Sequence, residues 1–234
     1  MIGSRPDGAV TVIELDRHER RNALDLAHCQ QLQAAVEQAD GRAVLITGAG
    51  SSFCAGADLS GVYGPDFRQA LYGMLAAVAA KPVPVLAAVN GPAIGAGTQL
   101  ALACDLRVAA PSARFAIPTA RNGLAVDPWT IRRLAELAGG GTARGILLGC
   151  DSYDAEFALS RGLVDRLGDV PAALAWAHEL AELAPLTHAY NKLTLNGAEP
   201  AQVEAAFEKC WDSADQAEAE LARRERRPPT FTGR

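Results

Sequence analysis

Two glycine-rich stretches decide the fold of this chain: Gly48-Ala-Gly-Ser-Ser-Phe-Cys-Ala-Gly-Ala-Asp58 and Asn90-Gly-Pro-Ala-Ile-Gly-Ala-Gly-Thr-Gln99. Each follows an apolar segment that predicts a buried strand, residues 43–47 and 83–89. Glycine lets a backbone approach another group closely and adopt angles denied to other residues. The second stretch leads into a predicted helix over residues 98–104, so its free N–H groups and the positive helix end would face whatever lies there. Two N–H groups from separate bends can hold one developing oxyanion, although either bend alone is also explained as a tight turn.

Strands and helices alternate around these stretches and then give way to helices alone. The pattern predicts strands over residues 10–15, 43–47, 83–89, 106–109 and 114–117, and helices over residues 27–39, 67–80, 98–104, 127–137, 141–148, 154–161, 171–184 and 199–226. This order indicates an α/β core followed by a helical C-terminal region. We expect residues 1–185 to form the core and residues 186–234 the helical region of the same functional unit. The alanine-rich late helices exceed what one small core covers, so we expect an oligomer.

The bulk composition is that of a soluble globular protein. Of 234 residues, 49% are hydrophobic and 21% are charged, and the net charge of −5 gives no footprint for nucleic acid. No apolar run approaches the ~18 to 20 residues of a membrane span, and residues 1–16 are too mixed in polarity for a signal peptide. The five cysteines and four histidines show no spacing typical of disulfides or a metal site. We therefore expect a cytoplasmic protein without a metal, a nucleic-acid partner or membrane insertion.

A dinucleotide-binding fold is the first alternative. The segment Gly91-Pro-Ala-Ile-Gly-Ala-Gly97 is similar to the G-x-x-x-G-x-G turn of short-chain dehydrogenases. However, it follows the third predicted strand and not the first, and no acidic residue ends a further strand about 20 residues later, where a ribose would need one. A Tyr-x-x-x-Lys pair is also absent, because Tyr190 and Lys192 are too close together. A dehydrogenase is therefore the weaker explanation.

Short motifs follow one another along nearly the whole chain. They are Arg21-Asn-Ala-Leu24, Thr47-Gly48, Phe53-Cys-Ala-Gly-Ala-Asp-Leu59, Lys81-Pro-Val-Pro-Val85, Asn90 to Gly97, Cys104-Asp-Leu-Arg-Val108, Phe115 to Gly123 and Arg226 to Gly233. In this order and spacing the chain resembles the crotonase family, also called the enoyl-CoA hydratase/isomerase family. Each motif is weak alone, but the ordered set is highly specific. The resemblance implies a crotonase-like ββα spiral core, a C-terminal helical trimerisation region, and a homotrimer or hexamer.

The resemblance also implies where the thioester of an acyl-coenzyme A binds. In the family, the thioester oxygen lies between two backbone N–H groups, which correspond to those of Ala57 and Ala96 here. Alanine at position 96, where the family has glycine, keeps the N–H group, so this oxyanion hole can still form. The stretches that hold coenzyme A match Arg21, Ala23, Ala55, Asp58 and Leu59. Coenzyme A is part of the ligand, so no separate cofactor is expected.

The acid–base residues of the family's hydratases are replaced in this chain. Those enzymes use two glutamates, and the matching positions hold Gln99 and Thr119. Glutamine cannot exchange a proton near neutral pH, and neither can threonine without a partner base. Each positioned acid or base contributes roughly a hundredfold to ten-thousandfold, so losing both should nearly abolish hydration while thioester binding remains. We therefore expect an acyl-CoA-binding protein of fatty acid or lipid metabolism with little hydratase activity.

Asp127 is the remaining candidate acid or base. Some family members place a catalytic aspartate at the matching position, which makes an enzyme of the enoyl-CoA hydratase/isomerase type the alternative function. Asp127-Pro128 is also a good helix N-cap followed by proline at the first helical position, and the two roles can coexist. Trp129 is a candidate wall of an acyl pocket or a core residue. The basic cluster Arg223, Arg224, Arg226 and Arg227 either contacts coenzyme A phosphates or forms paired surface charges.

Overall fold

The computed structural model describes residues 1–58 and 64–234, and its framework is a six-stranded sheet in the order β1-β2-β3-β4-β6-β9. β1 pairs antiparallel with β2, and every following pair in this sheet is parallel. A second sheet has the order β5-β7-β8. The strands are β1 (Ile2–Asp7), β2 (Val10–Leu15), β3 (Ala43–Gly48), β4 (Val85–Val89), β5 (Ala93–Ile94), β6 (Leu106–Ala109), β7 (Arg114–Ala116), β8 (Tyr153–Asp154) and β9 (Arg166–Leu167).

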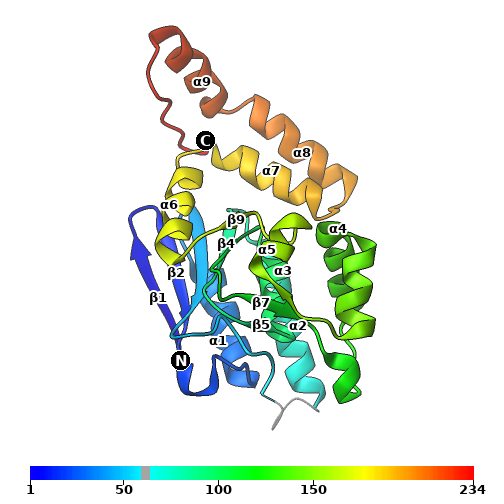
Figure 1. The fold of residues 1–234 in the computed structure, drawn as a ribbon. Helices are drawn as coiled ribbons and strands as arrows, with labels where there is room; N and C mark the ends of the chain where they lie inside the picture. The colour runs from blue at the N-terminus through cyan, green and yellow to red at the C-terminus, as the bar shows by residue number, and fades with distance from the viewer. Residues whose placement is uncertain (59–63) are drawn as a thin grey trace.

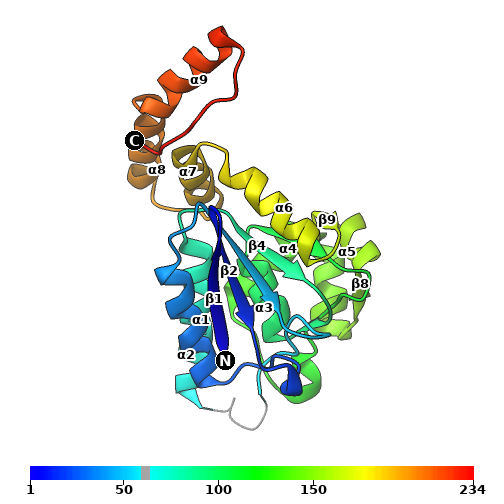
Figure 2. The same cartoon turned by 90° about the vertical axis from the view of Figure 1, so that its left-hand side faces the viewer.

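Helices cover both faces of the larger sheet. They are η1 (His18–Arg20), α1 (Leu26–Gln38), α2 (Pro65–Ala80), α3 (Ala96–Ala103), η2 (Thr119–Asn122), α4 (Pro128–Arg144), η3 (Gly145–Gly149), α5 (Ala155–Ser160), α6 (Val170–Ala181), α7 (Pro185–Leu195), α8 (Pro200–Trp211) and α9 (Ala214–Glu225). In Figure 2 the sheet stands between α1 and α2 on one side and α6 on the other. Both faces of its central strands are thereby buried, which explains why β3 and β4 are apolar runs without alternation.

Successive residues of each central strand enter two separate hydrophobic cores. In β3, Val44 and Ile46 join the larger core with α1, α2 and α3, whereas Ala43 and Leu45 join a smaller core. The smaller core is completed by the alanine stripe of α6, which consists of Ala173, Ala177 and Ala181. Because alanine is small, this stripe lets α6 lie close to the sheet. The predicted α/β core is therefore confirmed, and the strand predicted over residues 10–15 coincides with β2.

The C-terminal region differs from the prediction in two ways. The single helix predicted over residues 199–226 is wrong: the structure has α8 and α9, separated at Asp212 and Ser213. Ser213 caps α9 by accepting a hydrogen bond from the Gln216 N–H at 3.2 Å, so the second helix has its own start. The helix α7 is absent from the prediction. Figure 1 shows α7, α8 and α9 extending away from the sheet, with the chain returning from α9 to the sheet end.

Strand β1 and helix α4 also differ from the prediction. The N-terminal strand β1 was not predicted, because it is an exposed edge strand with Pro6 inside it and no apolar alternation. The predicted helices 127–137 and 141–148 correspond to α4 and η3, and α4 is kinked where Gly139 adopts φ 80°. The division into residues 1–185 and 186–234 stays a prediction.

Candidate functional site

The two glycine-rich bends lie side by side and are joined through the backbone. The Cys54 N–H donates to Pro92 O at 3.1 Å, and the Ile94 N–H donates to Cys54 O at 2.9 Å. On its other side, the first bend pairs with residues 21–24, where the Leu24 N–H donates to Gly56 O at 2.8 Å. Residues 21–24, 54–58 and 92–96 thus form a three-segment ladder whose rungs are main-chain hydrogen bonds.

Glycines set the spacing of this ladder. Gly56 has φ 104°, and a Cβ added there would lie 2.8 Å from Ile94 O and 3.7 Å from the Ala96 nitrogen. A Cβ added to Gly97 would lie only 2.1 Å from Cys54 O. Neither position has room for a side chain, since real Cβ atoms do not approach backbone oxygens so closely. The close approach of the two bends therefore depends on glycine at positions 56 and 97.

Ala57 and Ala96 both border a cavity of about 280 Å³ at the end of this ladder. Ala96 is the first residue of α3, where a backbone N–H has no partner within the helix. Within residues 1–58 and 64–234, neither the Ala57 N–H nor the Ala96 N–H donates a hydrogen bond. Two amide donors from separate bends are therefore available to a group inside one cavity.

Gln99 and Thr119 border the same cavity. Gln99 lies one turn beyond Ala96 in α3, and Thr119 begins η2. None of the described lining residues is an aspartate or a glutamate, and the one charged side chain is Arg68. The described wall of this cavity consequently offers amide, hydroxyl and guanidinium groups but no carboxylate.

Asp127 lies behind Gln99 and is engaged in capping α4. Its Oδ1 accepts from the Thr130 N–H at 3.0 Å, and its Oδ2 accepts from the Thr130 hydroxyl at 2.6 Å and from Gln99 Nε2 at 3.4 Å. The prediction of an Asp127 cap followed by proline at the first helical position is confirmed. The aspartate borders a second cavity of about 450 Å³, which Trp129 also lines. Trp129 also packs partly against the core, and its role as a wall of an acyl pocket stays a prediction.

Tyr72 lines both cavities. Burial raises the pKa of the Tyr72 hydroxyl, and the nearby charge of Asp127 raises it further. The hydroxyl therefore stays protonated at neutral pH. Cys54 is also inert, because complete burial raises the pKa of its thiol to about 12. The site is consequently suited to hydrogen bonding and not to nucleophilic attack by a thiolate.

The remaining predicted residues lie in or beside the ladder. Arg21 accepts from the Ala55 N–H at 2.9 Å through its carbonyl oxygen, and its side chain is exposed. Ala23 accepts a hydrogen bond from Arg17 Nη1 at 3.1 Å, also through its carbonyl oxygen. The Asp58 N–H donates to Leu24 O at 2.7 Å. The predicted contact residue Leu59 lies outside the described residues.

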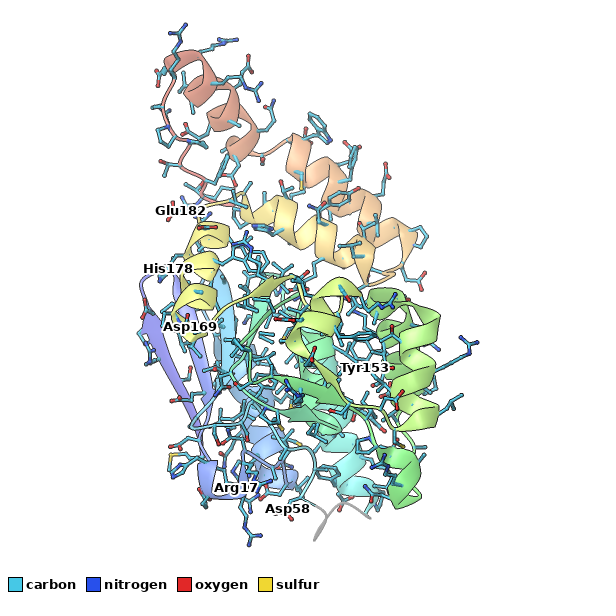
Figure 3. The ribbon with its side chains drawn as sticks, in the orientation of Figure 1. Arg17, Asp58, Tyr153, Asp169, His178 and Glu182 are labelled. Atoms are coloured by element: carbon cyan, nitrogen blue, oxygen red, sulfur yellow. The ribbon has the colours of Figure 1, made fainter. Side chains whose placement is uncertain are left out.

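Arg17 joins the neighbouring segments and was not predicted from the sequence. Its Nη1 lies 3.3 Å from Asp25 Oδ2, and its Nη2 lies 3.1 Å from Asp58 Oδ2. Figure 3 shows Arg17 and Asp58 together at one end of the molecule. No local pattern marks Arg17, because its contact with Asp58 spans two loops that are distant in sequence. Through these contacts, Arg17 anchors the segment that carries Ala57.

Two of the four arginines of the C-terminal basic cluster form ion pairs. Arg227 Nη1 lies 2.6 Å from Glu218 Oε1, its Nε lies 2.6 Å from Glu225 Oε2, and Arg224 pairs with Glu220. Of the two interpretations of this cluster, the pairing favours surface ion pairs for Arg224 and Arg227.

Comparison with known proteins decides the family. The sequence profile described as enoyl-CoA hydratase/isomerase matches residues 5–234. The chain belongs to the enoyl-CoA hydratase/isomerase family. This family, the crotonases, binds acyl-CoA substrates. The match leaves the dehydrogenase alternative without support.

Several relatives are similar to this chain over nearly their whole length. The protein named "Probable enoyl-CoA hydratase echA6" of Mycobacterium tuberculosis is 49% identical over 100% of both chains. The protein named "Probable enoyl-CoA hydratase" of Rhodobacter capsulatus is 37% identical over 96% of this chain and 95% of its own. The crystal structure of an enoyl-CoA hydratase from Bacillus anthracis superposes with a TM-score of 0.87 at 31% identity, covering 100% of this chain and 99% of that one. The crotonase fold predicted from the motifs is thereby confirmed.

Across residues 1–58 and 64–234, no group of three or more His, Cys, Asp or Glu side chains could hold a metal ion. In the same part of the chain, no helix has the length and apolarity needed to cross a membrane.

Proposed function

We propose that this crotonase binds acyl-CoA thioesters in fatty acid or lipid metabolism and has little hydratase activity. The observation that carries the proposal is the pair of unengaged N–H groups, those of Ala57 and Ala96, on a cavity whose described wall has no carboxylate. Two unengaged amides on one cavity suit one thioester carbonyl oxygen. Each such hydrogen bond contributes on the order of 1 kcal/mol net, which is about fivefold in affinity.

The low expected activity follows from Gln99 and Thr119. Hydration needs one group that activates water and one that protonates the α-carbon, and we propose that these two residues occupy the positions where hydratases have glutamates. Neither side chain exchanges protons readily near neutral pH. Binding of the thioester carbonyl oxygen does not depend on Gln99 or Thr119, because the two proposed donors are main-chain amides.

A catalytic role for Asp127 is the second candidate. Its carboxylate lies 3.4 Å from Gln99 Nε2, and Gln99 borders the cavity with the two amides. In this candidate function, Asp127 would transfer a proton in an isomerase-type reaction. The capping hydrogen bonds from Thr130 stabilise the charged carboxylate and so work against proton uptake.

We further propose that the protein assembles into a homotrimer or hexamer and acts in the cytoplasm. Support for assembly comes from α8, which buries no residue within the single chain. Phe207 and Trp211 on this helix are 38% and 61% exposed, and Leu195 at the end of α7 is 78% exposed. Apolar side chains gathered on one projecting region are typical of a protein interface.

Calorimetric titration with acyl-CoA esters of increasing chain length tests the binding. The matched variants are Ala96→Pro and Ala96→Gly. Proline at the first position of α3 removes the N–H while retaining a helical φ, whereas glycine keeps the N–H. We expect Ala96→Pro to weaken binding about fivefold or more and Ala96→Gly to bind nearly as well as the parent. Absence of binding by any CoA ester would refute the proposal.

A parallel assay of crotonyl-CoA hydration and double-bond migration separates the two candidate functions. We expect background rates for the parent protein. Turnover that Asp127→Asn abolishes would favour the enzyme, because asparagine still caps α4 but cannot exchange a proton.

A further inference from the structure

Arg133 on α4 is a largely buried cation without a close counter-ion. Its side chain is 19% exposed, and its Nη1 lies 3.8 Å from Glu136 Oε2, which is beyond hydrogen-bond distance. In the part of the chain that the structure describes, the Arg133 guanidinium forms no other ion pair and donates no hydrogen bond. Its nitrogen atoms are open to solvent. The five N–H donors of this guanidinium are therefore accessible to an added anion.

Two further cations lie near Arg133, and each has a carboxylate of its own. Nη2 of the buried Arg107 lies 3.2 Å from Asp165 Oδ2, and Nζ of the buried Lys192 lies 2.7 Å from Asp105 Oδ2. Burial lowers the pKa of the Arg107 guanidinium, and the charge of Arg133 lowers it further. Arg133 thus adds a positive charge that no close carboxylate of the described residues balances. An anion beside Arg133 would reduce the repulsion between the two guanidinium groups without displacing an existing partner.

Arg133 borders a cavity of about 200 Å³ between α4, α6 and α7, which we call the Arg133 cavity. Leu106 and Leu180 form part of an apolar wall, and Asn191 contributes a side-chain amide. Within residues 1–58 and 64–234, this amide makes no hydrogen bond. Since one water occupies ~30 Å³ in the liquid, the cavity has room for about seven non-hydrogen atoms. No described residue lines both this cavity and the one proposed to bind the thioester.

The chemistry of the lining selects the class of anion. A guanidinium presents two parallel N–H groups that match the two oxygens of a carboxylate. Asp105 lines the same cavity, so its charge disfavours a phosphate or another dianion. The apolar wall suits a hydrocarbon chain, which an inorganic anion lacks. These three features together favour a monocarboxylate with a short alkyl chain.

We propose that the Arg133 cavity binds the free anion of a short-chain carboxylic acid, with about seven non-hydrogen atoms as the size that fits. The carboxylate pairs with the Arg133 guanidinium and accepts a hydrogen bond from the Asn191 amide. The alkyl chain lies against Leu106 and Leu180. This second site does not depend on the proposed thioester binding, because the two cavities are separate.

The test measures dissociation constants by NMR titration with pentanoate, which has seven non-hydrogen atoms, and with pentanamide, which has the same shape without the charge. The variants are Arg133→Met, Arg132→Met and Glu136→Gln. Arg132 is the matched control, because it precedes Arg133 on α4, is exposed and does not line the cavity. Glu136→Gln removes the carboxylate that competes most closely for Arg133.

We expect pentanoate to bind the parent protein with a dissociation constant on the order of 1 mM, as suits so small a ligand. Pentanamide should bind at least about tenfold more weakly, and so should pentanoate to Arg133→Met, because a charge-assisted hydrogen bond is lost. Arg132→Met should not change the dissociation constant, and Glu136→Gln should tighten binding about twofold. If Arg133→Met does not fold, the comparison of pentanoate with pentanamide and the effect of Glu136→Gln decide the matter.

Three results would overturn the inference. The first is equal affinity for pentanoate and pentanamide, or unchanged pentanoate binding in Arg133→Met. The second is displacement of pentanoate by butyryl-CoA, which would place the carboxylate in the thioester cavity. The third is dissociation of an oligomer by Arg133→Met in analytical ultracentrifugation, which would show that a second copy of the chain supplies the anion. Failure of butyryl-CoA to bind would refute the proposed function and leave the Arg133 cavity unaffected.

Discussion

The Nη2 atom of Arg17 lies 3.1 Å from Oδ2 of Asp58, the residue directly after Ala57. The same guanidinium contacts Asp25 and the carbonyl oxygen of Ala23, so it ties the first bend to the segment beside it. We predict that Arg17→Met weakens acyl-CoA binding about fivefold, because the segment carrying the Ala57 N–H loses a charged anchor worth about 1 kcal/mol. Titration calorimetry measures this change.

The matched control for Arg17 is Arg5. Its ion pair with Asp7 is exposed and far from the cavity in sequence and in the sheet. Arg5→Met should leave binding unchanged, since exposed pairs contribute little. Equal effects of the two substitutions would show that Arg17 has no specific role at the site.

The second prediction concerns the close approach of the bends. Gly97→Ala would force a methyl group against Cys54 O, which its Cβ would meet at 2.1 Å. We expect a loss of roughly 2 to 3 kcal/mol in unfolding free energy, a melting temperature about 5 to 10 °C lower, and no detectable thioester binding. Gly141→Ala in α4 is the control, because an added Cβ there meets nothing within 4 Å. It should be neutral or stabilise by up to about 1 kcal/mol.

The third prediction is that restoring glutamates alone does not restore hydration. In Gln99→Glu, a second carboxylate would stand where the amide now donates toward Asp127. Like charges at this distance repel, so the double variant Gln99→Glu/Thr119→Glu should be less stable at pH 7 and should hydrate crotonyl-CoA poorly. Adding Asp127→Asn removes the repulsion and keeps the cap. We expect it to raise the melting temperature and to increase hydration at least about tenfold over the double variant; equal rates in both would contradict this account.

The fourth prediction concerns acid release of the C-terminal tail. The Arg227 guanidinium and then the Thr230 N–H lower the pKa of Glu218 from 4.5 to about 2. A lowered carboxyl pKa stabilises the folded state fully above the ordinary value, and this contribution is lost as the pH falls from about 4.5 to about 2. An NMR titration should therefore show the Glu218 carboxyl and the Thr230 N–H changing together near pH 2. In Arg227→Met the midpoint should move toward 4.5; a parent midpoint already near 4.5 would refute the tail attachment.

The fifth prediction tests the proposed assembly through α8. Trp211→Glu should convert the oligomer into smaller species in analytical ultracentrifugation, because a charge would replace an indole that is 61% exposed in the single chain. Leu148→Glu is the control, since Leu148 is 77% exposed but lies in η3, away from α8. A monomeric parent protein, or dissociation by both variants alike, would count against α8 as the interface.

The sequence predicts those elements whose burial leaves a clear apolar pattern in the chain. Strands β3 and β4 are covered on both faces and therefore appear as continuous apolar runs. Strand β1 is an exposed edge with no such signal, and the break between α8 and α9 depends on one serine cap inside a helical pattern. The buried Lys192 of helix α7 is explained only by partners distant in sequence: its Nζ lies 2.7 Å from Asp105 Oδ2 and donates to Val78 O and Val83 O, each at 3.3 Å.

In the candidate site, residues marked by a local sequence pattern could be predicted, whereas residues that act through distant contacts could not. The bends of Ala57 and Ala96 are marked by glycines that a local turn requires, so their importance is visible in the sequence. Arg17 and Thr130 act through contacts with distant segments and were missed; the Thr130 hydroxyl accepts from Gln99 Nε2 at 2.9 Å. Thr130 had one local signal, since it lies three residues after Asp127, where a capping side chain contacts the backbone.

The three-segment ladder has a consequence for how such a protein tolerates mutation during evolution. Its hydrogen bonds belong to main-chain atoms that every amino acid except proline shares, so substitutions at positions other than the close-packed glycines leave these bonds in place. Reactivity, in contrast, resides in a few interchangeable side chains. Under the proposed function, a crotonase built in this way would lose hydration through two substitutions and still bind its thioester, which is a short route from an enzyme to a binding protein.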